Sequence, residues 1–287
     1  MTIFDKFMQK DNFISLPDIA SRLLEILQED DVDVNEIVRL IESDPVISMK
    51  VLKMANSPIF QARTQIVDLN QATQILGTKR VSDIVFSVSL HSKLFIGRNL
   101  NIYPLLEKYF YNSFLVGNLS KVFLDFYDSR TRNGLFVSGL LHDIGRMIMI
   151  QMEPLDYVRV IELMNLEDIS EIEAENHIFK ENHTLVGTNL AEVWSLPEMV
   201  RSVITNYTEP SKATNFQTLS YGVNVSKEYV NRISAKDFEN LENISLSNFK
   251  NYNTLDSMIH ISDKKRLIDE KMKELIVNLP DSYVLFK

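Results

Sequence analysis

The chain has 287 residues, of which 45% are hydrophobic and 24% charged, so it can bury a sizeable core, and disorder of the whole chain is excluded. Its 30 basic and 39 acidic residues give a net charge of -9, which argues against nucleic acid as the main partner. Cysteine is absent, which excludes disulfides, thiolate metal sites and a thiol nucleophile, and fits a reducing compartment such as the cytoplasm.

No segment has the pattern of a signal peptide or a membrane span. Residues 1–8 lack a charged region followed by an apolar stretch, so we expect the mature protein to begin here. The apolar window 81–95 is interrupted by Asp83, His91 and Lys93, and it is shorter than the roughly 20 apolar residues that a span needs. A cytoplasmic protein without a membrane span is therefore expected.

Apolar residues recur at helical spacing along nearly the whole chain. Ala20, Leu23 and Leu27, for example, lie on one face of a helix, and no segment alternates as a half-buried strand does. We expect helices over 20–27, 34–41, 45–55, 68–76, 79–95, 109–126, 132–152, 155–164, 168–179, 184–194, 197–207, 218–230 and 255–279. The predicted fold class is all-α.

Capping residues place several helix ends. Asp33 with Glu36 has the spacing of a capping box, and Asp44 precedes a proline that suits the first helical position. Gly77 predicts a left-handed residue after one helix, and Thr78 is expected to cap the next helix.

A break in the pattern near residues 97–104 predicts a boundary between two lobes. We expect an N-terminal helical lobe over 1–100, a helical core over 101–210 and a C-terminal helical extension over 211–287. The extension is richer in Asn, Ser and Lys, and it is expected either to cover a pocket of the core or to form a partner surface.

Two groups of residues could carry chemistry. His142 and Asp143 lie between Gly139 and Gly145 in an otherwise apolar segment, where glycine is costly unless helices or a ligand approach closely. A metal site and a buried, hydrogen-bonded histidine are both consistent with this pair. The second group contains Glu175, His177 and His183, for which the ordinary interpretation is a solvated loop.

Taken together, these motifs resemble a known family. They are, in chain order, Leu16-Pro17, Ser43-Asp44-Pro45, Asn56-Ser57-Pro58, Leu76-Gly77, Gly139 with His142-Asp143-Ile144-Gly145, Glu175, His183, Gly187 and Trp194-Ser195-Leu196-Pro197. From about Leu16 to Pro210 the chain is similar to the HDOD family, the HD-related output domains of bacterial signalling proteins. The resemblance implies an all-helical fold of two lobes, in which an N-terminal bundle packs on an HD-like core, and a regulatory role.

The resemblance also implies which residues would bind metal. HD hydrolases hold one or two metals with an upstream histidine, the His-Asp pair, further histidines and a late aspartate. Here His142, Asp143 and His183 match and are candidates for a single divalent metal. The other positions carry Asn112, the pair Asn206-Tyr207, and Asn224 near the place of the late aspartate. Because amides are poorer ligands than carboxylate or imidazole, we expect no cofactor and a structural polar cluster.

The expected function is a non-enzymatic signal-transduction module, a stand-alone HDOD protein that binds a separate signalling protein. Self-association of the chain stays open. The alternative is a divergent metal-dependent HD phosphohydrolase, or a nucleotide sensor, that uses His142, Asp143 and His183.

Overall fold

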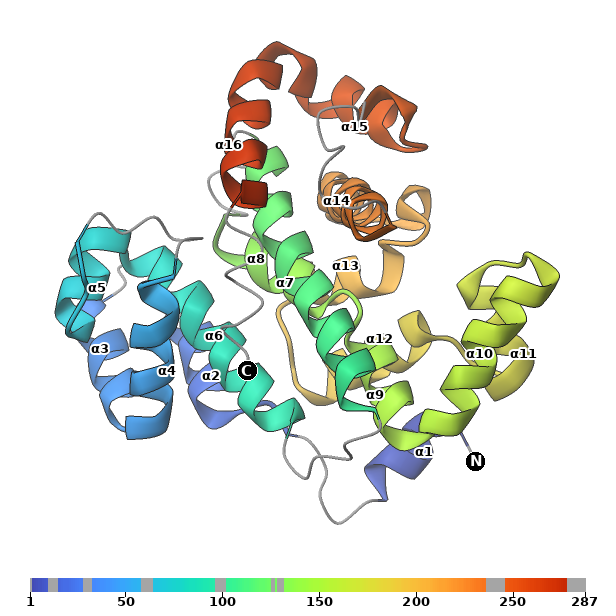
Figure 1. The fold of residues 1–287 in the computed structure, drawn as a ribbon, viewed down its shortest axis with the longest axis horizontal. Coiled ribbons are helices and arrows are strands. Elements are labelled where there is room, and N and C mark those ends of the chain that lie inside the picture. The colour runs from blue at the N-terminus through green and yellow to red at the C-terminus, as the bar shows by residue number, and fades with distance from the viewer. Residues whose placement is uncertain are drawn as a thin grey trace. The chain divides into compact units, whose positions relative to one another are not determined.

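The structure is a computed structural model that describes residues 2–9, 15–27, 33–57, 64–95, 102–124, 127, 132–235 and 246–277 (Figure 1). Every regular element in these ranges is a helix, which confirms the predicted all-α class. The chain forms two compact units, each built from two stretches of sequence. The first unit comprises Met1–Phe13 and Arg98–Asp263, and the second comprises Ile14–Gly97 and Lys264–Lys287. The division into the segments 1–100, 101–210 and 211–287 stays a prediction.

The second unit has an apolar core around one long helix. Its helices are α2 (Asp18–Ile26), α3 (Val34–Glu42), α4 (Pro45–Ala55), α5 (Leu69–Leu76), α6 (Thr78–Leu94) and α16 (Lys265–Val277). α6 packs against α2, α4 and α5, and the helical stripes expected from the sequence point inward: Leu23, Ile37 and Ile41 have no exposed surface. This unit is therefore assembled by burial of amphipathic helix faces.

The caps of the second unit partly match the prediction. Asp44 accepts hydrogen bonds from the backbone N–H groups of residues 46 and 47, with proline at the first helical position, as predicted. Asp33 caps α3 through the backbone N–H of Asn35, without a reciprocal bond from Glu36. Gly77 has a φ of 80°, as expected, but it is itself the N-cap of α6. Thr78 is the first helical residue, so its prediction as a cap is wrong.

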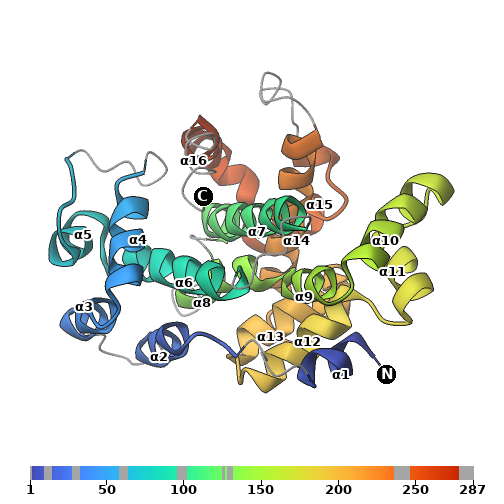
Figure 2. The same ribbon diagram turned by 60° about the horizontal axis from the view of Figure 1, so that its bottom comes forward.

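The first unit contains the remaining helices. They are α1 (Ile3–Met8), α7 (Tyr103–Leu124), α8 (Arg132–Leu141), α9 (Ile144–Met152), α10 (Pro154–Glu167), α11 (Glu171–Phe179), α12 (His183–Val193), α13 (Glu198–Asn206), α14 (Gln217–Ala235) and α15 (Tyr252–Ile259). α7 packs against α8 and α14, and α12 packs against α9 and α13 (Figure 2). Helix α1, which the sequence analysis did not predict, has a capping box between Thr2 and Asp5, and its Lys6 pairs with Glu153 at 2.6 Å.

Several predicted helices differ from the observed ones, three of them at an interruption or a cap. The predicted helix 132–152 is interrupted at His142–Asp143, where Asp143 becomes the N-cap of α9. The predicted helix 255–279 is broken at His260, which adopts a left-handed conformation with a φ of 52°. The predicted start at Asp168 is also wrong, because this left-handed residue ends α10 and Ser170 caps α11.

Within the described ranges, no helix is both long and apolar enough to cross a membrane.

Candidate functional site: a buried ionic cluster

Close helix crossings bring the polar residues of the first unit together. Gly145 of α9 lies against Gly187 of α12, and a Cβ atom at Gly145 would overlap the backbone oxygen of His183. Gly139 of α8 lies in the same way against the backbone of Gly117 in α7. The glycines that flank the His-Asp pair therefore serve close helix approach, which is one of the two reasons expected for them. The crossing of α9 and α12 places His183 next to Asp143.

The centre of the cluster is the carboxylate of Asp143, which is 3% exposed. Its Oδ1 accepts hydrogen bonds from the Tyr207 hydroxyl at 2.5 Å and from Lys227 Nζ at 3.1 Å. Its Oδ2 contacts Lys227 Nζ at 3.2 Å and one guanidinium nitrogen of Arg146 at 3.2 Å. Both carboxylate oxygens are thus engaged by the cations of α9 and α14.

The charges of these groups compensate one another. Burial acts to raise the pKa of Asp143, but the Arg146 and Lys227 charges hold it well below 3.8. Burial acts to lower the pKa of Arg146, while Asp143 and Glu171 hold it well above its ordinary value. Burial lowers the pKa of Lys227 from 10.5, and Asp143 acts in the opposite direction. Asp143 and Arg146 therefore form a buried ion pair, and Lys227 extends it.

His142 is neutral at physiological pH. Burial lowers its pKa to about 4, because a charged imidazole would lose its hydration. Its Nδ1 donates to the backbone oxygen of Gly139 at 2.6 Å, so its Nε2 carries the lone pair. This Nε2 lies 3.5 Å from Asp143 Oδ2 and accepts no hydrogen bond. The ring packs edge-on against Tyr207. His142 is thus a buried, hydrogen-bonded histidine with one unused acceptor.

His183 connects two carboxylates through Tyr207. Its Nδ1 and its backbone nitrogen lie 2.6 and 2.9 Å from Oε2 of Glu175, which is fully buried. Its Nε2 lies 2.6 Å from the Tyr207 hydroxyl and 3.8 Å from Asp143 Oδ1. A hydroxyl carries one proton, so Tyr207 can donate to Asp143 or to His183, but not to both at once. The hydroxyl proton of Tyr207 can therefore lie toward Asp143 or toward His183.

An outer set of contacts closes the network. The Tyr157 hydroxyl lies 3.1 Å from Glu175 and 3.3 Å from Glu171, and the second oxygen of Glu171 pairs with Arg146 at 2.5 Å. The Tyr109 ring lies against the Arg146 guanidinium, 4.8 Å from ring centroid to carbon. Hydrogen bonds and ion pairs thus form a ring through α9, α10, α11, α12 and α13. We call the seven residues of this ring, with Lys227, the ionic cluster: Asp143, Arg146, Tyr157, Glu171, Glu175, His183, Tyr207 and Lys227.

The structure places Nε2 of His142 and Nε2 of His183 near different oxygens of Asp143, at 3.5 and 3.8 Å, and the role of the three residues as metal ligands stays a prediction. The second predicted group is divided: Glu175 and His183 are buried, so their interpretation as a solvated loop is wrong, whereas His177 is exposed.

Two cations of the cluster were missed by the sequence analysis. Arg146 had a weak signal, because it follows Asp143 by three residues and so lies on the same side of the turn into α9. Lys227 had no signal, since its approach to Asp143 depends on how α14 packs. Asn224, one turn earlier, donates instead to the backbone oxygen of Tyr207 at 2.9 Å.

The donor atoms fit a divalent metal poorly. A metal at this place would need the oxygens of Asp143 and the Nε2 lone pairs of His142 and His183. Both Asp143 oxygens already bind the ammonium or guanidinium groups, and these two charges would repel a third, divalent one. In the part of the chain that the structure describes, no three His, Asp or Glu side chains converge as a metal site.

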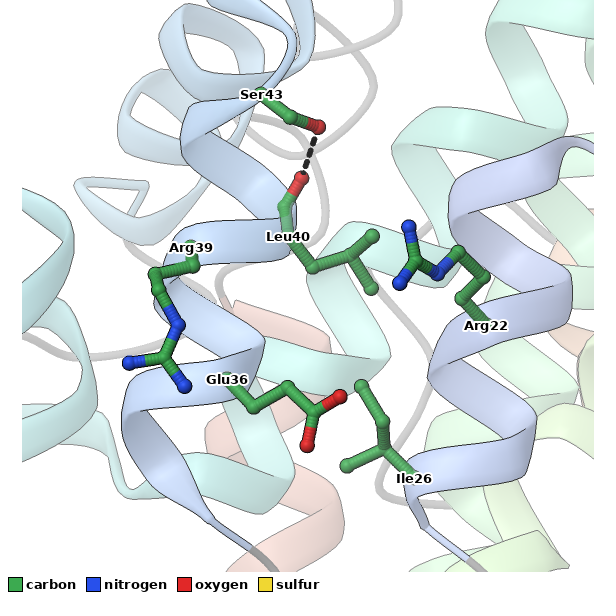
Figure 3. Close-up of a pocket in the computed structure, with 6 residues that line it drawn as sticks. All are labelled: Arg22, Ile26, Glu36, Arg39, Leu40 and Ser43. Atoms are coloured by element: carbon green, nitrogen blue, oxygen red, sulfur yellow. Dashed lines mark hydrogen bonds between the residues drawn. The ribbon is translucent and has the colours of Figure 1, made fainter.

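Each unit also has a cavity. In the first unit a cavity of about 250 Å³ adjoins the ionic cluster; it is lined by Tyr207, Thr208, Asn224, Lys227, Glu228, Asn231, Lys250 and Asn251. In the second unit a cavity of about 240 Å³ lies between α2 and α3 (Figure 3). There Arg22 and Glu36 extend from facing helices, and the Ser43 hydroxyl turns back to the backbone oxygen of Leu40 at 2.7 Å. The cavity of the second unit is lined by no residue of the ionic cluster.

Comparison with solved structures identifies the fold. An HDOD domain protein of unknown function from Geobacter sulfurreducens superposes with a TM-score of 0.80 at 21% identity, covering 98% of this chain and 97% of that one. A Shewanella amazonensis SB2B protein whose name suggests a phosphohydrolase superposes with a TM-score of 0.75 at 16% identity, covering 99% of this chain and 98% of that one. A Marinobacter aquaeolei VT8 protein whose name suggests signal transduction superposes with a TM-score of 0.74 at 14% identity, covering 100% of this chain and 61% of that one. At these identities the likeness concerns the fold.

Comparison of sequences identifies the family. An uncharacterized protein from Treponema pallidum (strain Nichols) is 26% identical over 203 residues, which are 68% of this chain and 38% of that protein. The chain therefore matches well under two thirds of the length of this curated relative. The family model of the HDOD domain matches residues 13–210, which is more than half of the chain, and this protein therefore belongs to the HDOD family.

Proposed function

We propose that this protein is a non-enzymatic signal-transduction module of the cytoplasm that acts through contact with another protein. The observation that carries the proposal is the position of Lys227, whose ammonium binds both oxygens of Asp143 at 3.1 and 3.2 Å. This ammonium binds the carboxylate that a metal would have to bind if the His-Asp pair served a hydrolase, and this supports a non-enzymatic role.

The charge balance of the centre supports this proposal. A metal-dependent phosphohydrolase needs an ion that lowers the pKa of a bound water and neutralises charge on phosphate. Here Arg146 and Lys227 supply positive charge without an open coordination position for water. Their hydrogen bonds to Asp143 would have to break before a metal could enter, which leaves the buried Arg146 and the part-buried Lys227 without their counter-ion. The arrangement favours a structural centre.

The interaction role is supported by exposed apolar side chains on α10 and by the signalling name of one structural relative. Leu155 and Leu166 are 81% and 83% exposed, and their spacing of eleven residues, about three turns, puts them on one helix face. Contiguous exposed apolar patches mark protein contact sites, and we take this face of α10 as the candidate for one. Replacing both with glutamine should abolish co-purification of a cross-linked partner and leave the melting temperature unchanged. A partner retained at wild-type yield would contradict a role for this face.

The sharpest test of the non-enzymatic role is metal content. The protein is purified without chelator or nickel resin, incubated with Mn²⁺, desalted and measured by elemental mass spectrometry. We expect no stoichiometric metal and no hydrolysis of phosphomonoester or phosphodiester model substrates. The variant Lys227→Gln asks whether removal of the ammonium admits a metal.

Two histidine variants give this test its specificity. Near-stoichiometric metal that is lost in His142→Ala but kept in His177→Ala would overturn the proposal and favour the phosphohydrolase. His177 is the matched control because it is an exposed histidine on α11, outside the ionic cluster. Metal that is kept in His142→Ala but lost in His177→Ala would point to a surface site and leave the proposal standing.

A further inference from the structure

The cavity beside the ionic cluster is lined almost entirely by polar side chains. Lys227 and Lys250 supply two ammonium groups, Thr208 supplies a hydroxyl, and Asn231 and Asn251 supply amides. Lys250 and Asn231 are exposed, and Lys227 forms the wall shared with the cluster. A lining of this kind offers hydrogen-bond donors and positive charge, and it offers little to an apolar ligand.

The carboxylate that lines the cavity within the described part of the chain is neutralised locally. Glu228 pairs with Arg232 at 2.7 Å, four residues later on α14. Arg232 also lies over the ring of Phe249, with its guanidinium carbon 4.3 Å from the ring centroid. Among the residues that the structure describes, the other charged groups that line the cavity, Lys227 and Lys250, are both positive.

The segment that carries Lys250 is fixed to α14, so the cavity is formed in advance. Phe249 is buried, and its ring is held by Arg232 and by Tyr229. Asn251 donates to Oδ1 of Asn224 at 2.8 Å, and Asn224 donates in turn to the backbone of Tyr207. A ligand would therefore meet Lys250 and Asn251 without an ordering cost for this segment.

Size and charge point to a compact anion. A volume of about 250 Å³ lies below the usual range for drug-sized ligands, so only a small molecule or a single anionic group would fit. Lysine binds the tetrahedral oxygens of phosphate as a point charge, whereas planar carboxylates are matched best by the arginine fork. None of the described residues that line this cavity is an arginine.

We propose that this cavity binds the phosphate group of a small molecule between Lys250 and Lys227, and that the ligand is read out through Lys227. All three donor directions of the Lys227 ammonium are used in the structure, on the two oxygens of Asp143 and on the Tyr207 hydroxyl. A phosphate in the cavity competes with Asp143 for this ammonium. Its binding therefore weakens the ion pair at the centre of the cluster and shifts the surroundings of His142 and Tyr207.

Phosphate binding does not depend on the proposed function, but its role as a signalling input rests on it. The test uses the full chain, with its metal content already measured, and calorimetric titration with inorganic phosphate and with glycerol phosphate. Sodium chloride at equal ionic strength is the blank. We expect saturable binding, weakened about tenfold or more by Lys250→Gln, the loss expected for one charge-assisted hydrogen bond.

The matched control is Lys212→Gln. Lys212 is an exposed lysine of the same unit that pairs with Glu209 and lies outside the cavity, so its loss should leave binding unchanged. Tighter binding of glycerol phosphate than of inorganic phosphate would indicate a phosphate ester as the ligand, and equal binding would indicate the free ion. Both results support a phosphate site. A response equal to that of chloride, or full binding by Lys250→Gln, would overturn the proposal.

The read-out is followed by proton NMR of the His142 ring, which packs on Tyr207. Its signals should move on phosphate addition in the wild type and stay fixed in Lys250→Gln. Phosphate binding with a motionless His142 signal would reject the read-out through Lys227. Stoichiometric metal that depends on His142 but not on His177 would instead reject the non-enzymatic function, whatever the phosphate result, so the two failures can be told apart.

Discussion

The two units of this protein are built around opposite kinds of centre. In the second unit, apolar stripes of short helices pack against α6, and Leu23, Ile37 and Ile41 are fully buried. In the first unit, a buried network of carboxylates, cations and hydroxyls lies between α9, α12, α13 and α14. The apolar centre is stabilised by the area removed from water. The polar centre is held together only if every buried charge keeps its partner.

This difference decides what each unit tolerates. A lost methyl group in the second unit costs the transfer free energy of the group and a small cavity. A lost charge in the first unit leaves its partners buried without compensation, which costs several times more. The first unit should therefore respond strongly to single charge changes within the ionic cluster, and the second only weakly to the loss of a single methyl group.

The largest expected effect is that of Asp143→Asn. The variant leaves Arg146 and Lys227 facing a neutral amide, and we expect a loss of about 3–5 kcal/mol in the free energy of unfolding, measured by urea denaturation. Adding Lys227→Met to this variant should recover part of the loss, because one uncompensated charge is then removed. A single-variant loss below about 1 kcal/mol would show that the cluster is not charged and buried as described.

The next effect is a loss of stability in mild acid. Since burial lowers the pKa of His142 to about 4, the unfolded chain takes up a proton there before the native one does as the pH falls. The free energy of unfolding is therefore unaffected by His142 above about pH 6.5. Between about pH 6.5 and about pH 4, protonation of His142 in the unfolded chain lowers this free energy by about 3 kcal/mol. Asp143 stays ionised throughout, because its pKa lies well below 3.8.

Urea unfolding at a series of pH values checks this loss. His142→Asn keeps a donor toward Gly139 but has no titrating group. It should flatten the plot of the free energy of unfolding against pH between about pH 6.5 and about pH 4. His177→Asn, at an exposed position, should keep the wild-type curve. An unchanged slope in His142→Asn would assign the acid loss to other groups.

A smaller effect is expected from Tyr207→Phe. The hydroxyl contacts Asp143, His183 and Lys227, and its removal should cost about 2 kcal/mol because these buried groups lose a partner. Tyr221→Phe on α14 is the matched control and should cost well under about 1 kcal/mol. Equal losses in the two variants, again by urea unfolding, would argue against a special role for the Tyr207 hydroxyl.

The smallest effect concerns a cap in the second unit. Asp44→Ala removes the acceptor of two backbone N–H groups at the start of α4, and we expect a loss of about 1 kcal/mol. Asp44→Ser, which keeps an acceptor, should restore most of it. A loss as large as that of Asp143→Asn would break the contrast between the two units.

The sequence by itself determined much of the second unit and the order of most helices. Apolar spacing such as that of Ala20 and Leu23 and caps such as Asp44 are local properties, and the burial and hydrogen bonds they predict are present. Interruptions were harder to see: the apolar pattern of residues 132–152 continues through His142, so it does not reveal the break. The flanking glycines did indicate a close approach, which was confirmed at Gly139 and Gly145.

Tertiary structure alone decided how the candidate site is charged. The motif pointed to His142, Asp143 and His183, and helix crossing brought them together. Whether a cation of the chain reaches Asp143 depends on the packing of α14, which is 84 residues away along the chain at Lys227. No local pattern encodes such a distance. Helix faces follow from the spacing of neighbouring residues, whereas the partner of a buried charge is chosen only when distant helices meet.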